Sequence, residues 1–326
     1  MKTQFAVGFP KVPKMSIPVV RTVKEVREYR ERWRKEGQKV GFVPTMGFLH
    51  QGHQSLVKKS LSENDATVVS IFVNPSQFAP GEDLDAYPRN LEHDLGVLAE
   101  VGGPNQSVSL VFAPTVSEIY PSGIPLDVAS QKGAFVNVVG VAEQLEGKCR
   151  PAFFRGVTTV LAKLFNIVEP NNAYFGQKDV QQTIVVRKMV ADLFFNMKIT
   201  VLPIIRAESG LARSSRNAYL SDSVKEKAMC LFKSLKAAKN EYETKHECSV
   251  AKLTQLVRQT IESASPKFAI DYIAFNDPED LHYLESIDTS VGCILSMAVY
   301  VPNDFQDQSK GTTRLIDNSI FGPLRG

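Results

Sequence analysis

Apolar and polar positions follow one pattern up to about residue 205 and another beyond it. In the first part, helical patterns separate several short apolar runs, at residues 40–44, 67–73, 110–113, 173–175 and 200–205. Runs that are apolar at nearly every position are typical of strands buried on both faces, as in parallel sheets whose crossover helices cover them. The pattern predicts a doubly wound α/β domain with a parallel sheet.

The second part begins with a polar loop and two helical patterns, near residues 223–242 and 249–264. Three apolar runs follow, and a polar, turn-rich segment at residues 302–311 separates the last two. The runs cover residues 268–275, 293–301 and 314–320. This order predicts a smaller α+β domain with an antiparallel sheet and a long hairpin loop. We place the boundary so that residues 1–202 form the larger domain and residues 203–326 the smaller one.

The clearest helix signal spans residues 22–36. Apolar positions that include Val26 and Trp33 recur at helical spacing, and Thr22 with Glu25 forms a capping box. The basic residues of this segment alternate with acidic ones, which is typical of a solvated helix face. We therefore assign this helix no function.

Composition narrows the class of protein. The 326 residues are 43% hydrophobic and 22% charged, which is enough for two folded domains. The net charge is +3, from 38 Lys and Arg against 35 Asp and Glu, too little to bind nucleic acid or a membrane surface through bulk charge. No apolar run approaches the roughly 20 residues of a membrane span. We expect neither a nucleic-acid nor a membrane partner.

The cysteines and the first twenty residues indicate the cellular compartment of the protein. The four cysteines lie far apart, without a CxxC pair or a His at zinc-ligand spacing, which indicates neither a disulfide framework nor a structural metal. We expect a cytoplasmic protein, because the first twenty residues lack the apolar run of a secretory signal. They carry three Lys and no acid, so a weak organellar presequence is the alternative.

The most informative motif lies in residues 41–56, GFVPTMGFLHQGHQSL. An apolar strand and a Pro-Thr-Met-Gly turn lead through His50, Gly52 and His53 into a helical pattern. Ligands of open α/β sheets bind at the carboxyl ends of the strands, and a helix N-terminus favours phosphate. Two imidazoles at this spacing can donate hydrogen bonds to one anion, and Gly52 allows close backbone approach. The context favours a nucleotide phosphate site, although a histidine pair alone is more often structural.

A second apolar run leads into Asn74 and Gln77, within residues 69–89. Amide side chains at a strand end can orient a polar substrate, but an Asn-Pro turn also forms for backbone reasons alone. Asp94, further along, can equally hold a metal ion or start a helix. By themselves these residues do not distinguish a substrate or metal site from an ordinary turn and helix start.

A third motif is YFGQKDVQQ, residues 174–182. A strand ends at Gly176 and a helical pattern opens near Asp179, so Lys178 lies at the edge that faces a bound phosphate. Gln182 follows one helical turn later on the same face. The alternative is that Asp179 merely caps the helix and Lys178 is solvated.

A fourth segment, residues 206–220, is a polar loop at the predicted domain boundary. It carries Ser214, Ser215 and Arg216. Hydroxyls and a guanidinium on a mobile loop can close over a triphosphate and stabilise the departing pyrophosphate. An ordinary solvated linker is the alternative.

Together these segments resemble the pantothenate synthetase (pantoate–β-alanine ligase) family. The resemblance rests on PTMGFLHQGHQSL (44–56), SIFVNPSQFAPGEDLDAYPR (70–89), YFGQKDVQQ (174–182), GLARSSRNAYLS (210–221) and RLIDN (314–318). It implies the HxGH nucleotidyltransferase superfamily and a homodimer. It also implies a Rossmann-like N-terminal domain that binds nucleotide and pantoate, with a smaller C-terminal α+β lid domain.

The resemblance implies a ligation in two steps. ATP and pantoate give pantoyl adenylate and pyrophosphate, and the amine of β-alanine then attacks the mixed anhydride to give pantothenate and AMP. Adenylation supplies the leaving group that a carboxylate lacks, and an enclosed site protects the anhydride from water. Mg²⁺ is expected with ATP, and Asp94 is its candidate ligand.

The family's functional residues carry over by position. His53 matches the family's proton donor, and we interpret its role as charge stabilisation at the α-phosphate. Gln77 and Gln182 match the pantoate-binding glutamines, assisted by Asn74. The expected catalytic residues are His50, His53, Lys178 and Arg216. The expected ATP-binding residues are Met46, Gly47, His50, Gly52, His53, Gly176, Gln177, Lys178, Asp179, Ile205, Arg213, Ser214, Ser215 and Arg216.

The sequence departs from the family pattern at three positions. Gln51 and Gln177 stand where Glu is common, and Phe153 replaces a His within RPAFFRG (150–156). Gln keeps the length and hydrogen-bonding capacity of Glu, whereas Phe153 leaves the role of its segment open.

Two other interpretations of the sequence are an HxGH nucleotidyltransferase with a phosphorylated substrate and a nucleotide-binding protein without activity. The amides favour a hydroxylated carboxylate, and the intact histidines favour catalysis.

Overall fold

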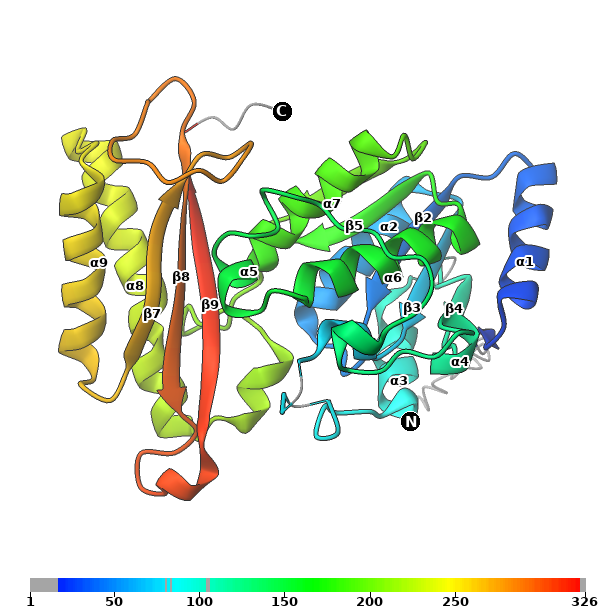
Figure 1. The fold of residues 1–326 in the computed structure, drawn as a ribbon, viewed down its shortest axis with the longest axis horizontal. Coiled ribbons are helices and arrows are strands. Elements are labelled where there is room, and N and C mark those ends of the chain that lie inside the picture. Colours follow the sequence, from blue (N-terminus) through cyan, green and yellow to red (C-terminus); the bar gives the residue numbers. More distant parts are fainter. Residues whose placement is uncertain (1–16, 80, 83, 104–105, 323–326) are drawn as a thin grey trace, which may run out of the picture.

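Two sheets organise the chain. The computed structural model describes residues 17–79, 81–82, 84–103 and 106–322. Within them a six-stranded sheet and a three-stranded sheet lie side by side (Figure 1). The first sixteen residues, on which a presequence would depend, lie outside the described part of the chain.

The larger sheet is parallel, with the order β1-β4-β3-β2-β5-β6. Its strands are β1 (Val19–Val20), β2 (Val40–Thr45), β3 (Ala66–Ile71), β4 (Leu110–Phe112), β5 (Asn172–Gly176) and β6 (Lys198–Leu202). The chain moves outward from β2 on one side and from β5 on the other, so the strand order reverses between these two strands. A crevice opens at the carboxyl ends of such a pair. The predicted doubly wound parallel sheet is confirmed.

Helices cover both faces of the larger sheet. Phe42 belongs to an apolar core that includes residues of α1, α6 and α7, and its neighbour Val43 belongs to a second core that includes residues of α2 and α3. Both side chains are fully buried, which explains the unbroken apolar runs of the sequence. The helices are α1 (Val23–Lys35), α2 (Gln51–Glu63), α3 (Leu91–Val101), α4 (Val116–Ile119), α5 (Glu146–Cys149), α6 (Phe153–Val168) and α7 (Val180–Asp192).

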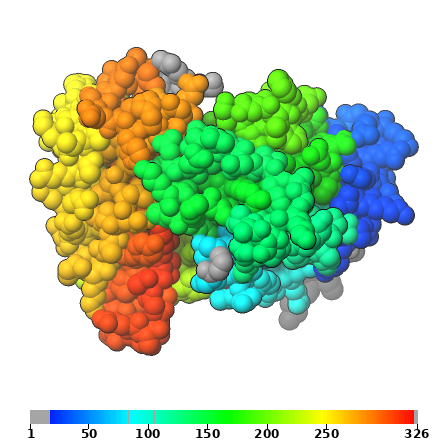
Figure 2. Space-filling model, viewed as in Figure 1, coloured from blue at the N-terminus to red at the C-terminus, as the bar shows by residue number. Residues whose placement is uncertain are grey.

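The smaller sheet is antiparallel, in the order β7-β8-β9, as the sequence predicts. Its strands are β7 (Ala269–Asn276), β8 (Cys293–Pro302) and β9 (Thr312–Phe321). Its helices, α8 (Asp222–Lys245) and α9 (Val250–Ala264), share an apolar core with it. The predicted hairpin loop connects β8 to β9. Figure 2 shows the green surface near α5 lying against the orange and red surface of this sheet.

Several details differ from the sequence prediction. β6 ends at Leu202 rather than at residue 205, because Pro203 has no backbone N–H for a ladder. The short strand β1, which pairs with β4, was not predicted, since two residues carry no periodicity. The capping box of Thr22 and Glu25 on α1 is confirmed. Among the described residues, no helix has the length and apolar character to cross a membrane.

Candidate active site

A cavity of about 900 Å³ lies at the carboxyl ends of β2 and β5. The larger sheet contributes the ends of both strands and the start of α2, and the smaller sheet contributes residues of β8 and β9. The cavity therefore occupies the crevice at which the strand order reverses, and it is shared between the two sheets. This is where the topology predicts a ligand.

Most of the predicted site residues meet in this cavity. Those that line it are Met46, His50, Gly52, His53, Asn74, Gln77, Gly176, Lys178, Asp179, Gln182, Ile205, Arg213, Ser214, Ser215 and Arg216. Gly47, Gln177 and Asp94 are not among the lining residues. The four sequence motifs thus come together although they are far apart along the chain, because parallel strands present their carboxyl ends at one edge.

The two histidines are built into the start of α2. His50 is the N-cap, and its Nδ1 accepts a hydrogen bond from the Gly52 N–H over 3.1 Å. His53 Nδ1 accepts from the His50 N–H over 3.3 Å. The ring centroids are 4.1 Å apart. The turn therefore uses Nδ1 of both rings and leaves Nε2 of both for a ligand.

Both imidazoles are neutral at physiological pH. Burial, with the nearby charge of Lys178, lowers the pKa of His50 to about 4. Burial, with the proximity of His50, lowers the pKa of His53 to about 3. Because Nδ1 of each ring accepts a hydrogen bond, the proton of the neutral ring resides on Nε2. The pair thus presents two N–H donors that carry no charge.

Two amide residues that line the cavity, Asn74 and Gln77, have different roles. Asn74 is 1% exposed, and its Oδ1 accepts hydrogen bonds from Ser76 and from the Tyr120 hydroxyl. Its Nδ2 donates to Gln77 Oε1 over 3.0 Å. Gln77 Nε2 lies 3.1 Å from Met46 Sδ, a weak acceptor that a substrate oxygen can replace. Asn74 therefore orients Gln77, and Gln77 is the group that can contact a substrate.

Positive charge collects at the β5 end of the cavity. No described residue forms an ion pair with Lys178 or Arg213, so both are available to an anion. The loop of Lys178 is held from β9, because Asn318 Nδ2 donates to the carbonyls of Gln177 and Lys178 over 2.9 and 3.0 Å. Ser214 Oγ accepts from the Arg216 N–H and starts the short helical turn there. Gln177 thus acts in this loop, away from the cavity.

Asp94, the residue expected to bind magnesium, lies outside the cavity. Its side chain is 1% exposed and does not line the cavity. Its two carboxylate oxygens accept hydrogen bonds from the backbone N–H groups of Phe48 and Leu49. These two hydrogen bonds tie Asp94 to the turn that precedes α2.

Comparisons with known proteins decide the family. A sequence model described as pantoate-beta-alanine ligase matches residues 18–320. The chain belongs to the pantoate–β-alanine ligase family. The pantoate–β-alanine ligase of Saccharomyces cerevisiae is 44% identical over 93% of this chain and 99% of its own length. The pantothenate synthetase of Herpetosiphon aurantiacus is also 44% identical, over 93% of this chain and 99% of its own length.

Solved structures of the pantoate–β-alanine ligase family share the fold. Pantothenate synthetase from Thermus thermophilus has a TM-score of 0.81 at 41% identity, covering 94% of this chain and 100% of that one. The Francisella tularensis pantoate–β-alanine ligase, described as complexed with beta-gamma ATP and β-alanine, has a TM-score of 0.70 at 34% identity, covering 93% and 97%. The family and the Rossmann-like fold expected from the sequence are confirmed.

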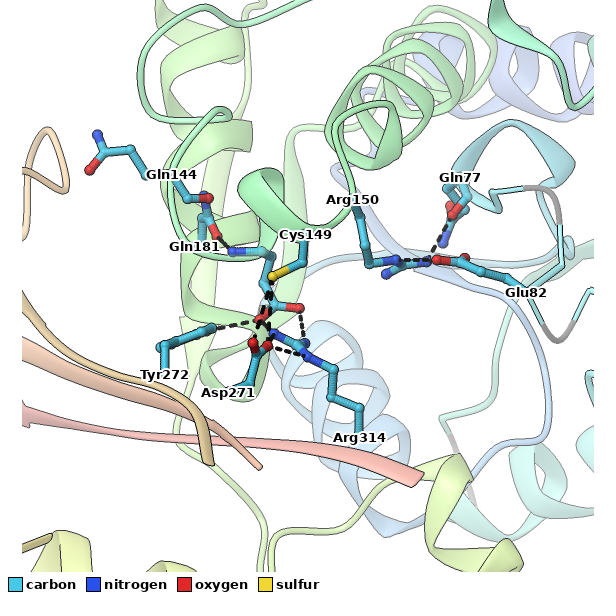
Figure 3. A network of polar contacts seen from close by, with 10 residues as sticks. Gln77, Glu82, Gln144, Cys149, Arg150, Gln181, Asp271, Tyr272 and Arg314 are labelled. Carbon is cyan, nitrogen blue, oxygen red and sulfur yellow. Dashed lines mark hydrogen bonds and ion pairs between the residues drawn. The ribbon is translucent and has the colours of Figure 1, made fainter. Parts of the chain in front are cut away.

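Sequence reasoning missed a polar network between α5 and the smaller sheet (Figure 3). Arg314 of β9 donates hydrogen bonds to Glu146 over 2.5 and 2.8 Å and to Asp271 over 2.7 and 2.9 Å. The Tyr272 hydroxyl donates to Glu146 over 2.8 Å. We call Glu146, Asp271, Tyr272 and Arg314 the clasp. The sequence signal for it is Arg314 at the start of the family's RLIDN motif, since its partners are remote in sequence.

The segment that contains Phe153 also has a role in the structure. Arg150 donates to both carboxylate oxygens of Glu82, over 2.7 and 2.6 Å, and to the Gln77 carbonyl over 3.1 Å. The centroid of the Phe153 ring lies 4.0 Å from the Arg150 guanidinium, a cation–π arrangement. At the cavity wall, this chain therefore packs the aromatic face of Phe153 against Arg150.

Proposed function

We propose that this chain catalyses the ATP-dependent condensation of pantoate with β-alanine to pantothenate, AMP and pyrophosphate. The observation that carries the proposal is the meeting of two neutral imidazole donors with Lys178 and Arg213 in the crevice between β2 and β5. Relatives at 44% identity bear the name of this activity, and a family structure is described with ATP and β-alanine. The cavity thus suits a triphosphate and a small polar acid.

In the first step, a carboxylate oxygen of pantoate attacks the α-phosphorus of ATP, and the bond to the bridging oxygen of pyrophosphate breaks. The Nε2–H groups of His50 and His53 donate to phosphate oxygens on which charge accumulates. Lys178 and Arg216 stabilise the departing pyrophosphate. Catalysis then comes from positioning and charge stabilisation, so His53 does not need to transfer a proton.

In the second step, the amine of β-alanine attacks the acyl carbon of pantoyl adenylate, and AMP departs. Gln77 and Gln182 hold the pantoyl group through both steps. We propose that Mg²⁺ enters bound to phosphate oxygens of ATP, as part of the substrate. Asp94 takes no part in its binding, because its oxygens are enclosed by the turn they support.

The resemblance supports three wider proposals. Residues 1–202 and 203–326 act as two domains, the smaller one as a lid. The chain belongs to the HxGH superfamily and forms a homodimer. Sedimentation equilibrium measures the mass of the assembly and so tests the dimer directly. The protein works in the cytoplasm, and its four cysteines, which form no disulfide, agree with a reducing compartment.

The decisive experiment is pantoate-dependent exchange of labelled pyrophosphate into ATP, with Mg²⁺ present and β-alanine absent. This assay isolates adenylation, because exchange requires reversible formation of an acyl adenylate. We expect exchange that depends on pantoate. Folded protein that binds ATP but shows no exchange would contradict the proposal and favour a phosphorylated substrate or a protein without activity.

Two substitutions at His53 test the role of its ring. Asn places an amide near the position of Nδ1 and keeps the hydrogen bond from the His50 N–H, whereas Gln places one near Nε2. We expect His53→Asn to lower the exchange rate by about 10²- to 10³-fold, as removal of an oxyanion donor does, and His53→Gln to retain more activity. Equal rates for His53→Asn and the wild type would disprove the assigned role.

A further inference from the structure

The turn between β2 and α2 delivers both histidines to the cavity, and its backbone is strained. Gly47 has a φ of 87° and Phe48 a φ of 50°. The left-handed region is free of steric cost for glycine but not for phenylalanine, whose Cβ comes too close to a carbonyl oxygen. Something outside the turn must therefore stabilise this conformation.

Asp94 supplies that stabilisation from α3. Its Oδ2 accepts from the Phe48 N–H over 2.9 Å, and its Oδ1 accepts from the Leu49 N–H over 2.7 Å. Two consecutive N–H groups bound to one carboxylate fix the direction of the backbone between them. The carboxylate lies in the first turn of α3, where the helix N-terminus favours negative charge.

The surroundings of Asp94 leave little room for another position of the turn. A Cβ on Gly47 would lie 2.9 Å from Asp94 Oδ2 and 3.2 Å from Ile71 Cγ2, so a side chain at this position would need its neighbours to shift. The Phe48 ring stacks on His93 with centroids 5.9 Å apart. At the other end of the turn, Thr45 Oγ1 accepts from the Gly47 N–H and donates to the Ser70 carbonyl.

We propose that Asp94 is a positioning residue for the histidine pair. It acts through the backbone of Phe48 and Leu49 on His50, the N-cap of α2, and it touches neither substrate nor metal. This inference rests on the proposed function, because the reaction it affects is adenylation. A displacement of about 1 Å at a reacting group can lower a rate by about 10².

The test compares Asp94→Asn with the wild type in pantoate-dependent pyrophosphate exchange. The amide keeps one acceptor but points an NH₂ group at a backbone N–H, so the turn loses one hydrogen bond and gains a repulsion. We expect kcat to fall by about 10² while the KM for ATP and pantoate change by less than about threefold. Glu92→Gln is the matched control, because it removes an exposed acid from the same helix turn and should leave kcat unchanged.

Two further measurements on Asp94→Asn test whether Asp94 positions the turn, binds a metal ion or only stabilises the fold. Excess Mg²⁺ should not restore Asp94→Asn, whereas it would restore a weakened metal site. Phe48→Gly removes the cost of the positive φ, so adding it to Asp94→Asn should raise kcat about fivefold, which corresponds to about 1 kcal/mol. If Asp94→Asn does not fold, Asp94→Glu replaces it, because it keeps the charge and shifts the carboxylate by one methylene.

Three results would overturn the inference: a kcat of Asp94→Asn near that of the wild type, recovery in excess Mg²⁺, or an equal loss in Glu92→Gln. If Asp94→Glu is the variant used, a kcat equal to that of the wild type would also overturn the inference. Failure of the proposed function gives a different result, because the wild type itself would then show no exchange.

Discussion

The clasp predicts that the Arg314 guanidinium helps to hold α5 against the smaller sheet. Arg314 makes hydrogen bonds to both Glu146 and Asp271, and the three side chains are 16%, 12% and 22% exposed. Burial alone lowers the pKa of Arg314, but its hydrogen bonds to Glu146 and Asp271 outweigh this and raise the pKa. The guanidinium therefore stays charged, and its removal leaves two carboxylates without a cation.

We choose Arg314→Met, which keeps much of the apolar stem and removes the charge. Breaking a buried ion pair by removing one partner costs about 3–5 kcal/mol, mainly because the remaining charge is left unpaired. Two carboxylates lose their partner here, but each keeps some exposure to water. We therefore expect the free energy of unfolding to fall by about 3 kcal/mol.

The assay is urea denaturation followed by far-UV circular dichroism. Arg258→Met is the matched control, because Arg258 pairs with Glu262 one helical turn away on an exposed face of α9. Such a pair contributes about 0.3–0.5 kcal/mol. Adding Glu146→Gln to Arg314→Met should recover part of the loss, since it removes one uncompensated charge. Equal losses in Arg314→Met and Arg258→Met would refute the reasoning.

Two further predictions concern the histidine pair and the support of Gln77. The pKa of both histidines is lower in the folded protein than in the unfolded chain. Below about pH 6.5 the unfolded chain therefore binds protons that the folded protein does not. Each ring then lowers the free energy of unfolding by about 1.4 kcal/mol for every pH unit. Urea unfolding should show stability falling between about pH 6.5 and pH 4, and less steeply in His53→Asn; an unchanged slope argues against buried neutral rings. Gly156→Ala would place a Cβ 2.1 Å from the Ser76 carbonyl oxygen and 2.7 Å from the Gln77 backbone nitrogen. This overlap should lower the free energy of unfolding by at least about 1–3 kcal/mol. It should also raise the KM for pantoate in the exchange assay, because it displaces Gln77. Gly96→Ala, with no atom within 4 Å of the added Cβ, is its control, and equal stability of the two variants contradicts the close packing.

The local pattern was sufficient for the fold and for the residues that follow strands. Short unbroken apolar runs are typical of strands buried on both faces, and Phe42 and Val43 are fully buried in this way. His50 lies in the turn that follows β2, Lys178 lies just after β5, and parallel strands bring their carboxyl ends to one edge. Their meeting in one cavity also depends on the pairing of β2 with β5, which the structure shows and the alternation of elements did not predict.

Other roles depend on partners that no local pattern identifies. From sequence, Asp94 looks like a metal ligand or a helix start, and only its contacts with Phe48 and Leu49 show that it supports the turn. Asn74 looks like a substrate amide, yet its hydrogen bonds go to the protein.

The clasp joins Glu146 to Arg314, 168 positions apart. The pattern of apolar and polar residues thus specifies the main helices and strands and the side chains that follow them. Which polar atoms bond within the protein, and which stay available to a ligand, follows from the packing, because hydrogen bonds between remote residues leave no periodic signal.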